Sequence, residues 1–413
     1  MAKTTEPSTF EWRIKLKPNC LKQFQNAGER FLLDISELQD NDKKVAGIYC
    51  LFAPVEIVRA AGAIPVSLCG KREQPIADAE RTLPPNLCPL IKSSYGYAVT
   101  DSCPFFSASD FLIGETTCDG KKKMYEFLGR IKPLHLMHLP YSASEPHALK
   151  FWHEEILRLG GFVEESTGLE INRDHLGFQI RIHNKIRKLI RKISRFQAAE
   201  KPPISGLDMM SVMETKSFFV NPEEYISLLL EFIAEMEPIA ASGFSPFQQD
   251  APRVLLTGCP VAKGCEKTLR MIEECGGAVV CMENCTGVKG LDLLVDENEE
   301  DPFLALARRY LQIPCSCITP NDGRLALLDQ LIDEYRIDAV VDHTWQCCHT
   351  YNIESRIVGD FVEKIHGLPF IHVETDYSNS DVEQLRTRIE AFLEMARWNS
   401  SACAQMRKPY TQA

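Results

Sequence analysis

Residues 110–125 read DFLIGETTCDGKKKMY, and this stretch shows the pattern that decides the fold. Its apolar start, DFLIGET, has the length and composition of a buried β-strand. The cysteine that follows, Cys118, lies between small polar residues, and the lysine-rich segment after Gly120 is typical of a helix. A thiol therefore stands where a strand passes into a helix. One such thiol would suggest a nucleophile, whereas several at separate strand ends would indicate another kind of site.

Apolar strands and amphipathic helices alternate in two regions of the chain. In the first region, strand-like runs occupy residues 47–52, 64–69, 110–116 and 133–140. In the second region, similar runs occupy residues 253–258, 278–283, 338–343 and 369–374. Because strands that alternate with helices form parallel sheets with right-handed crossovers, we predict an α/β fold with about four strands in each of two sheets. The similar size of the two regions suggests a pseudo-repeat.

Five segments follow from this pattern. They are an N-terminal helical segment 1–45, a first α/β domain 46–145, a helical region 146–250, a second α/β domain 251–380 and a C-terminal helix 381–413. Within the helical region, residues 183–196 read HNKIRKLIRKISRF, with apolar residues at helical spacing and basic residues on the other faces. We interpret the basic residues as a solvated surface, in preference to a docking surface for an acidic partner.

Composition excludes several classes of protein. The chain has 413 residues and a net charge of −11, which argues against a general nucleic-acid binder because phosphate binding needs a basic surface. Residues 1–15 contain no apolar run of the signal-peptide kind, and no stretch approaches the roughly 18 consecutive apolar residues that a membrane span requires. We therefore expect a cytoplasmic protein that neither enters a membrane nor binds nucleic acid.

The chain is rich in cysteine, with 16 residues of this type. In a reducing compartment this content indicates metal or redox chemistry in preference to disulfides. Some of the cysteines fit the pattern of buried small apolar residues: Cys20, Cys265, Cys275, Cys281 and Cys403. The others need a different explanation.

Most of the remaining cysteines follow predicted strands or lie in loops. Those at strand ends are Cys118, Cys259, Cys285, Cys347 and Cys348, and those in loops include Cys88, Cys315 and Cys317. Ligands of open α/β sheets bind outside the carboxyl ends of the strands, so several thiols are expected to face one site. The spacings match neither ferredoxin runs nor the paired C-x2-C pattern of zinc sites. The sequence therefore favours an iron–sulfur site between two domains over structural zinc or a single catalytic thiol.

Seven motifs carry a family resemblance: NLCPLIKSSYGY, GETTCDGKKKMYE, TGCP, ENCTG, CSCITPND, CHTYNIES and VETDYS. Together, and in this order from about residue 30 to 395, they resemble the double-cubane cluster proteins. These belong to the superfamily of 2-hydroxyacyl-CoA dehydratases and benzoyl-CoA reductases. The resemblance implies two Rossmann- or flavodoxin-like domains with the cluster bound between them.

The resemblance also implies two sets of cluster ligands. The first cubane would be held by Cys88, Cys118 and Cys348, with Cys347 a poorer candidate than Cys348. The second would be held by Cys259, Cys285 and Cys315, with Cys317 a close rival of Cys315. Both sets together imply an [8Fe–9S] double cubane, and the first alone a single [4Fe–4S] cluster. We interpret Cys50, Cys69 and Cys103 as packing residues or residues behind the ligands.

The implied activity is the reduction of a small molecule by low-potential electrons. In the family an ATP-hydrolysing activator with its own [4Fe–4S] cluster delivers these electrons, and the cluster protein is a homodimer. The chain contains neither G-x-x-x-x-G-K-[ST] nor G-x-G-x-x-G, so we assign ATP to the partner. The alternatives are a [4Fe–4S] subunit of a 2-hydroxyacyl-CoA dehydratase and a cluster-bearing electron carrier without its own substrate.

Two residues are candidates for proton transfer. Glu56 is expected in the first turn of the helix after the first strand, where dehydratase relatives use a carboxylate. An interaction of this carboxylate with the helix dipole is the other interpretation. His349, next to Cys348, would donate protons or hydrogen-bond a cluster sulfide, or would be a packed or capping histidine.

Overall fold

Two four-stranded sheets, both entirely parallel, form the framework of the protein. The computed structural model describes residues 16–39 and 42–406, with the backbone only for Gln39 and residues 400–406. The first sheet contains β1 (Val45–Ile48), β2 (Ile64–Ser67), β3 (Phe111–Glu115) and β4 (Leu134–Met137). The second contains β5 (Arg253–Gly258), β6 (Ala278–Glu283), β7 (Ala339–Trp345) and β8 (Phe370–Thr375). The predicted α/β fold with two short parallel sheets is confirmed.

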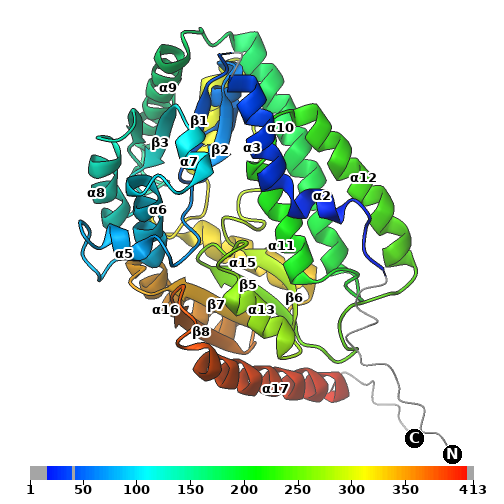
Figure 1. The fold of residues 1–413 in the computed structure, drawn as a ribbon. Coiled ribbons are helices and arrows are strands. Elements are labelled where there is room, and N and C mark those ends of the chain that lie inside the picture. Colours follow the sequence, from blue (N-terminus) through cyan, green and yellow to red (C-terminus); the bar gives the residue numbers. More distant parts are fainter. Residues whose placement is uncertain (1–15, 40–41, 407–413) are drawn as a thin grey trace, which may run out of the picture.

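The two sheets have the same topology. Their strand orders are β2-β1-β3-β4 and β6-β5-β7-β8, so the first strand of each sheet lies between its second and third. The connections that leave β1 and β3 run to opposite sides of the sheet, as do those that leave β5 and β7, and this opens a crevice at the carboxyl ends of each pair. Figure 1 shows β1, β2 and β3 in the upper half of the molecule and β5 to β8 in the lower half.

Helices connect and cover the strands. Those before and around the first sheet are α2 (Leu21–Gln25), α3 (Ala27–Gln39), α4 (Val55–Ala60), α5 (Ile76–Ala79), α6 (Pro89–Val99), α7 (Pro104–Ala108) and α8 (Asp119–Leu128). The central ones are α9 (Ala148–Thr167), α10 (Arg173–Ser194), α11 (Gly206–Glu214) and α12 (Pro222–Ala241), with 3-10 turns η1 (Arg195–Ala198) and η2 (Thr215–Ser217). The last are α13 (Lys267–Glu274), α14 (Pro302–Leu311), α15 (Asp322–Tyr335), α16 (His349–Ile365) and α17 (Val382–Met406). None of the helices in this described part of the chain is long and apolar enough to cross a membrane.

Helix α10 packs against both sheets' cores. Leu176 and Ile180, from its first half, lie in the core that contains β1 and β3. Ile186 and Ile190, further along, lie in the core of the second sheet. Helix α10 as a whole therefore joins the two halves of the molecule, whereas the apolar stripe seen in the sequence packs in the second core alone; α10 runs down from the upper half of Figure 1.

The basic residues of α10 do not form a uniformly solvated surface. Arg187 and Arg191 are 7% and 5% exposed. Arg187 pairs with Glu56, and Arg191 pairs with Asp292 and Glu334. The solvated-surface interpretation is therefore wrong for these two arginines, because acidic partners far away in the sequence cover them. It is right for the exposed basic residues of the segment, Lys185, Lys188, Lys192 and Arg195.

Helix α14 follows β6 in the chain but packs in the core of the first sheet. Its Leu306 and Tyr310 share that core with Trp152 of α9. This packing places the loop after α14, which carries Cys315 and Cys317, against the first half. The five segments proposed above stay a prediction, and this core takes side chains from both sides of the expected boundary at residue 251.

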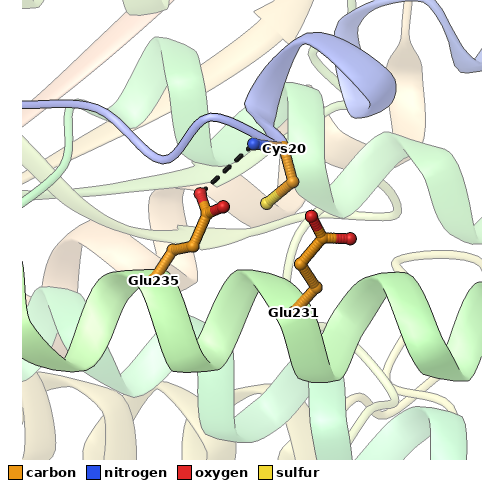
Figure 2. A group of neighbouring side chains, drawn as sticks. All are labelled: Cys20, Glu231 and Glu235. Atoms are coloured by element: carbon orange, nitrogen blue, oxygen red, sulfur yellow. Dashed lines mark hydrogen bonds between the residues drawn. The ribbon is translucent and has the colours of Figure 1, made fainter.

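Cys20 anchors the first described helix to α12. It is 2% exposed, and its backbone N–H donates a hydrogen bond to Glu235 at 3.2 Å. Figure 2 shows its thiol beside the carboxylates of Glu231 and Glu235, all within 4.8 Å of one another. Burial, together with these two carboxylates, raises the pKa of Cys20 to about 12. The thiol is therefore protonated, and we assign the group to the attachment of α2. The corresponding expectation for Cys403 lies outside the side chains that the structure describes.

Candidate metal centre

A cavity of about 770 Å³ lies where loops from both sheets meet. Eleven cysteines line it: Cys50, Cys69, Cys88, Cys118, Cys259, Cys265, Cys285, Cys315, Cys317, Cys347 and Cys348. All six of the predicted ligands are among them. The role of these six cysteines as cluster ligands stays a prediction.

Three of the predicted ligands are the residues at which helices begin. Cys88 precedes α6, Cys118 precedes α8 and Cys348 precedes α16, each in the N-cap position. The first turn of a helix leaves backbone N–H groups without intrahelical partners and carries the positive end of the helix dipole. Three such helix starts at one cavity favour negatively charged sulfur there.

The thiol of Cys348 lies between those of Cys88 and Cys259. Hydrogen bonds with Cys259 and Cys88 hold the pKa of Cys348 well below its usual value. The same contacts contribute to the raised pKa of Cys88, and for Cys259 they add to the larger effect of burial. The resemblance assigns Cys259 to the second ligand set, and in the structure its sulfur contacts the first.

Cys347 differs from its neighbour in backbone conformation. Its φ is 60°, in the left-handed region that side chains other than glycine rarely adopt. Such a conformation costs of the order of 1–3 kcal/mol and is commonly found at functional sites. Here it immediately precedes Cys348, the residue at which α16 begins and whose thiol contacts Cys88 and Cys259.

A second group of thiols contains Cys315, Cys317 and Cys285. Cys317 hydrogen-bonds the sulfur of Cys315, and this contact lowers the pKa of Cys315 to about 6 and raises that of Cys317. Burial raises the pKa of Cys285 to about 11, and the nearby Cys315 adds to this effect. Both members of the rival pair, Cys315 and Cys317, line the cavity.

Only the first lysine of the 121–123 run belongs to the site. Lys121 is 8% exposed, lines the cavity and donates a hydrogen bond to the Tyr49 carbonyl at 3.0 Å. Lys122 and Lys123 are exposed and pair with Asp119 and Glu126 on their own helix. A buried cation beside Cys118 stabilises a thiolate, whereas the other two lysines are ordinary surface residues.

Three further lysines line the cavity, and the sequence analysis missed all of them: Lys71, which pairs with Glu214, and Lys216 and Lys289. Lys289 is buried, its Nζ lies 3.0 Å from Glu283 and it donates to the hydroxyl of Tyr351 at 2.9 Å. Lys216 donates hydrogen bonds to the carbonyls of Thr286 and Gly287. These two residues lie between Cys285 and Lys289 in the chain. No local motif marks these lysines, because contacts distant in the sequence bring them to the cavity. Cys50 and Cys69 were also set aside, although each follows a strand, β1 or β2, as Cys118, Cys259 and Cys285 do.

The two acid–base candidates differ in position. Glu56 is fully buried and is not on the cavity wall; it pairs with Arg187 and accepts a hydrogen bond from Tyr310 at 2.7 Å. Burial alone would raise its pKa, but Arg187 and other neighbouring cations lower it to about 2. His349 is exposed, is the first residue of α16 and lines the cavity. Their catalytic roles stay predictions.

The donor set suits a cluster of several irons better than a single ion. Thiolates are soft ligands that bind zinc or iron–sulfur clusters. In the described chain, no three cysteine sulfurs lie within 4.8 Å of one another, as ligands of one ion would. Many thiols distributed around a large cavity, with lysines between them, match the ligands and charge compensation that a multi-iron cluster needs.

Comparison with known proteins identifies the family. Residues 50–396 match the family described as 2-hydroxyglutaryl-CoA dehydratase, D-component. The chain is 44% identical to the putative dehydratase subunit YjiM of Escherichia coli K12, over 92% of this chain and 98% of the relative. It is 24% identical to the beta subunit of lactoyl-CoA dehydratase of Anaerotignum propionicum, over 86% and 92%. It is 21% identical to the beta subunit of (R)-phenyllactyl-CoA dehydratase of Clostridium sporogenes, over 87% and 94%. The chain therefore belongs to the 2-hydroxyglutaryl-CoA dehydratase D-component family, within the 2-hydroxyacyl-CoA dehydratase superfamily.

Proposed function

We propose that this protein is the iron–sulfur component of a reductase, in the double-cubane branch of its superfamily. The ligands of its [8Fe–9S] cluster would be Cys88, Cys118, Cys348, Cys259, Cys285 and Cys315. The observation that carries the proposal is the convergence of eleven cysteines on one cavity. A single cubane of this superfamily would need only the first set of three.

When bound, such a cluster would supply low-potential electrons to a small molecule held in the cavity. The chain's own residues provide the setting. Three helix starts and the cations Lys121, Lys216 and Lys289 offset the negative charge of the thiolates. The hydroxyl oxygen of Tyr351 accepts a hydrogen bond from Lys289, which leaves its own proton available to the cavity that Tyr351 lines.

The proposal includes partners. An ATP-hydrolysing activator with its own [4Fe–4S] cluster would deliver the electrons, and the protein would work as a homodimer. Small unsaturated molecules are the substrate class to test first.

A second candidate function is the [4Fe–4S] subunit of a 2-hydroxyacyl-CoA dehydratase. The observation that favours it is the naming of relatives as dehydratase subunits, including the beta subunit of lactoyl-CoA dehydratase. In this function the cluster would be held by Cys88, Cys118 and Cys348 alone.

Iron and sulfide analysis of anaerobically purified protein separates the two candidates. A double cubane gives about eight irons per chain, and a single cubane gives about four. In the double-cubane case Cys285→Ala lowers the iron content, as does Cys88→Ala. Cys281→Ala is the matched control, because Cys281 lies buried in β6 close to Cys285 in sequence but is not on the cavity wall.

Two results would contradict the proposal. About four irons per chain that are lost in Cys88→Ala but retained in Cys285→Ala would support the dehydratase subunit. Full iron content without turnover of any small unsaturated acceptor, in the presence of the activator, ATP and a reductant, would support an electron carrier.

A further inference from the structure

One part of the cavity wall carries buried positive charge without matching carboxylates. We call it the cationic wall and define it by Arg59 of α4, Arg187 of α10 and Arg309 of α14, which line the cavity together with the imidazole of His183. The three arginines are 8%, 7% and 8% exposed. Charged side chains are rarely buried to this extent unless they are paired.

Only one of these arginines has an acidic partner among the described residues. Glu56 pairs with Arg187. Arg59 donates to the carbonyls of Phe219 at 2.6 Å and Val220 at 2.7 Å. Carbonyl oxygens hold a guanidinium group in place, but they do not neutralise its charge.

Arg309 is held in the same way. Its Nε donates to the Leu293 carbonyl at 2.9 Å and its Nη2 to the Gly290 carbonyl at 2.6 Å. A guanidinium group has five N–H donors, so both Arg59 and Arg309 retain donors beyond those that bind carbonyls. The Nε of Arg59 is buried and has no hydrogen-bond partner.

The energetic cost of these charges appears in their pKa values. Burial lowers the pKa of Arg59 to about 9. Burial and the neighbouring Arg187 lower the pKa of Arg309 to about 10. A charged group that is removed from water without a counter-ion is destabilised, and a bound anion would reverse this effect.

His183 contributes an unpartnered hydrogen-bond acceptor to the same cavity. Its Nδ1 lies 2.9 Å from the Gln179 carbonyl, which can only accept, so Nδ1 carries a proton and donates it. The other ring nitrogen, Nε2, is buried and has no hydrogen-bond partner. The side chain is 5% exposed and lines the cavity. Burial lowers the pKa of His183 to about 4, so the ring is neutral and Nε2 can only accept. A buried acceptor without a partner at a cavity is expected to meet ordered water or a donor group, and not the carboxylate itself.

We propose that the cationic wall binds the carboxylate of a small substrate. This inference rests on the proposed function, since it assigns a chemical class to the molecule that would be reduced. The groups that act most on the pKa of Arg309 are Arg187 of α10, Tyr310 of α14 and Glu56 of α4, and these helices do not carry the predicted ligands. The thiols have their own cations in Lys121 and Lys289.

A carboxylate fits the wall better than a phosphate does. The edge of a guanidinium group matches two oxygens of either anion, so the choice depends on the other groups at the site. Phosphates are commonly bound at helix N-termini. The three helix starts at this cavity are occupied by Cys88, Cys118 and Cys348.

Calorimetric titration tests this inference. Crotonate and its neutral amide, crotonamide, have nearly the same shape and differ in charge. We expect anaerobically purified protein to bind crotonate at least about tenfold more tightly, because a charge-assisted hydrogen bond contributes more than a neutral one. Arg309→Gln should remove this preference. The matched control is Arg308→Gln, since Arg308 is the adjacent residue, is exposed and pairs with Glu299 on the surface.

Three results would overturn it: equal affinity for the acid and the amide, unchanged crotonate binding in Arg309→Gln, or displacement of crotonate by equimolar inorganic phosphate. If Arg309→Gln does not fold, Arg309→Lys decides the matter. This variant keeps the positive charge but loses the planar guanidinium edge. It should therefore bind crotonate more weakly than the wild type does, and should still bind crotonate more tightly than crotonamide.

Iron and sulfide are measured on the same samples. Crotonate binding by protein without a cluster would contradict the proposed function and leave this inference standing. If the protein carries its full iron and sulfide but binds crotonate and crotonamide equally, this inference is wrong and the proposed function stands.

Discussion

The carboxylate of Glu56 and the guanidinium of Arg187 form a buried ion pair, although 131 residues separate them in the chain. The pair joins α4, which follows the first strand, to α10. Tyr310 of α14 completes the group with a hydrogen bond to the same carboxylate. Three elements that are distant in sequence therefore depend on one side chain.

Removal of the Glu56 charge should destabilise the protein strongly. We expect Glu56→Gln to lower the free energy of unfolding by about 3–5 kcal/mol, because it leaves a buried guanidinium without its counter-ion. Anaerobic urea unfolding measures this. The control is Glu237→Gln, whose carboxylate pairs on the surface with Lys192 of α10, and which should change stability by less than about 1 kcal/mol. A small effect of Glu56→Gln would show that the pair is dispensable.

The same pair should make stability depend on pH in acid. The pKa of Glu56 is lowered from 4.5 to about 2 in the folded protein. Its contribution is therefore complete above 4.5 and is lost as the pH falls through about 2. We expect the stability difference between wild type and Glu56→Gln to be constant near neutral pH and to shrink in this acid range. A difference that grows on acidification would contradict the lowered pKa.

Cys348 should matter more to cluster content than its neighbour. The sulfur of Cys348 contacts those of both Cys88 and Cys259. We expect Cys348→Ala to lose most of the iron and Cys347→Ala to retain it, as measured by iron analysis and visible absorbance. Iron loss in Cys347→Ala with retention in Cys348→Ala would reverse the ligand assignment.

Lys121 should tune the reduction potential of the site. Replacement of this buried cation by Met removes positive charge beside Cys118, so reduction should become harder and the potential more negative. Lys122→Met is the matched control, because Lys122 is exposed and pairs with Asp119. Potentiometric titration followed by electron paramagnetic resonance measures both. Equal shifts in the two variants would show that Lys121 acts no differently from a surface charge.

The strands and the location of the site could be predicted because their signals are local. RVLLTG and AVVCME form β5 and β6 with the predicted bounds, since short apolar runs in a covered parallel sheet have few alternatives. The run expected at 47–52 instead pairs as Val45–Ile48, because the chain leaves the sheet before Cys50 and enters the cavity loop.

The partners of helices could not be predicted in this way. Periodicity showed that α10 has a buried face, but it could not show that Arg187 and Arg191 would meet acids more than 100 residues away. It also could not place α14 in the core of the first sheet. Both depend on how the two halves pack together, and that arrangement decides which lysines and arginines reach the cavity.

Arg187 and Arg191 lie one turn apart on α10, and they pair with opposite halves of the molecule. Arg187 binds Glu56 beside the first sheet, and Arg191 binds Asp292 and Glu334 beside the second. The halves cannot swing apart about α10 without exposing one of these pairs to water. Opening of the cavity would therefore break one of these buried ion pairs. In the proposed function, iron and sulfide would enter a cavity that is already formed before the cluster is assembled.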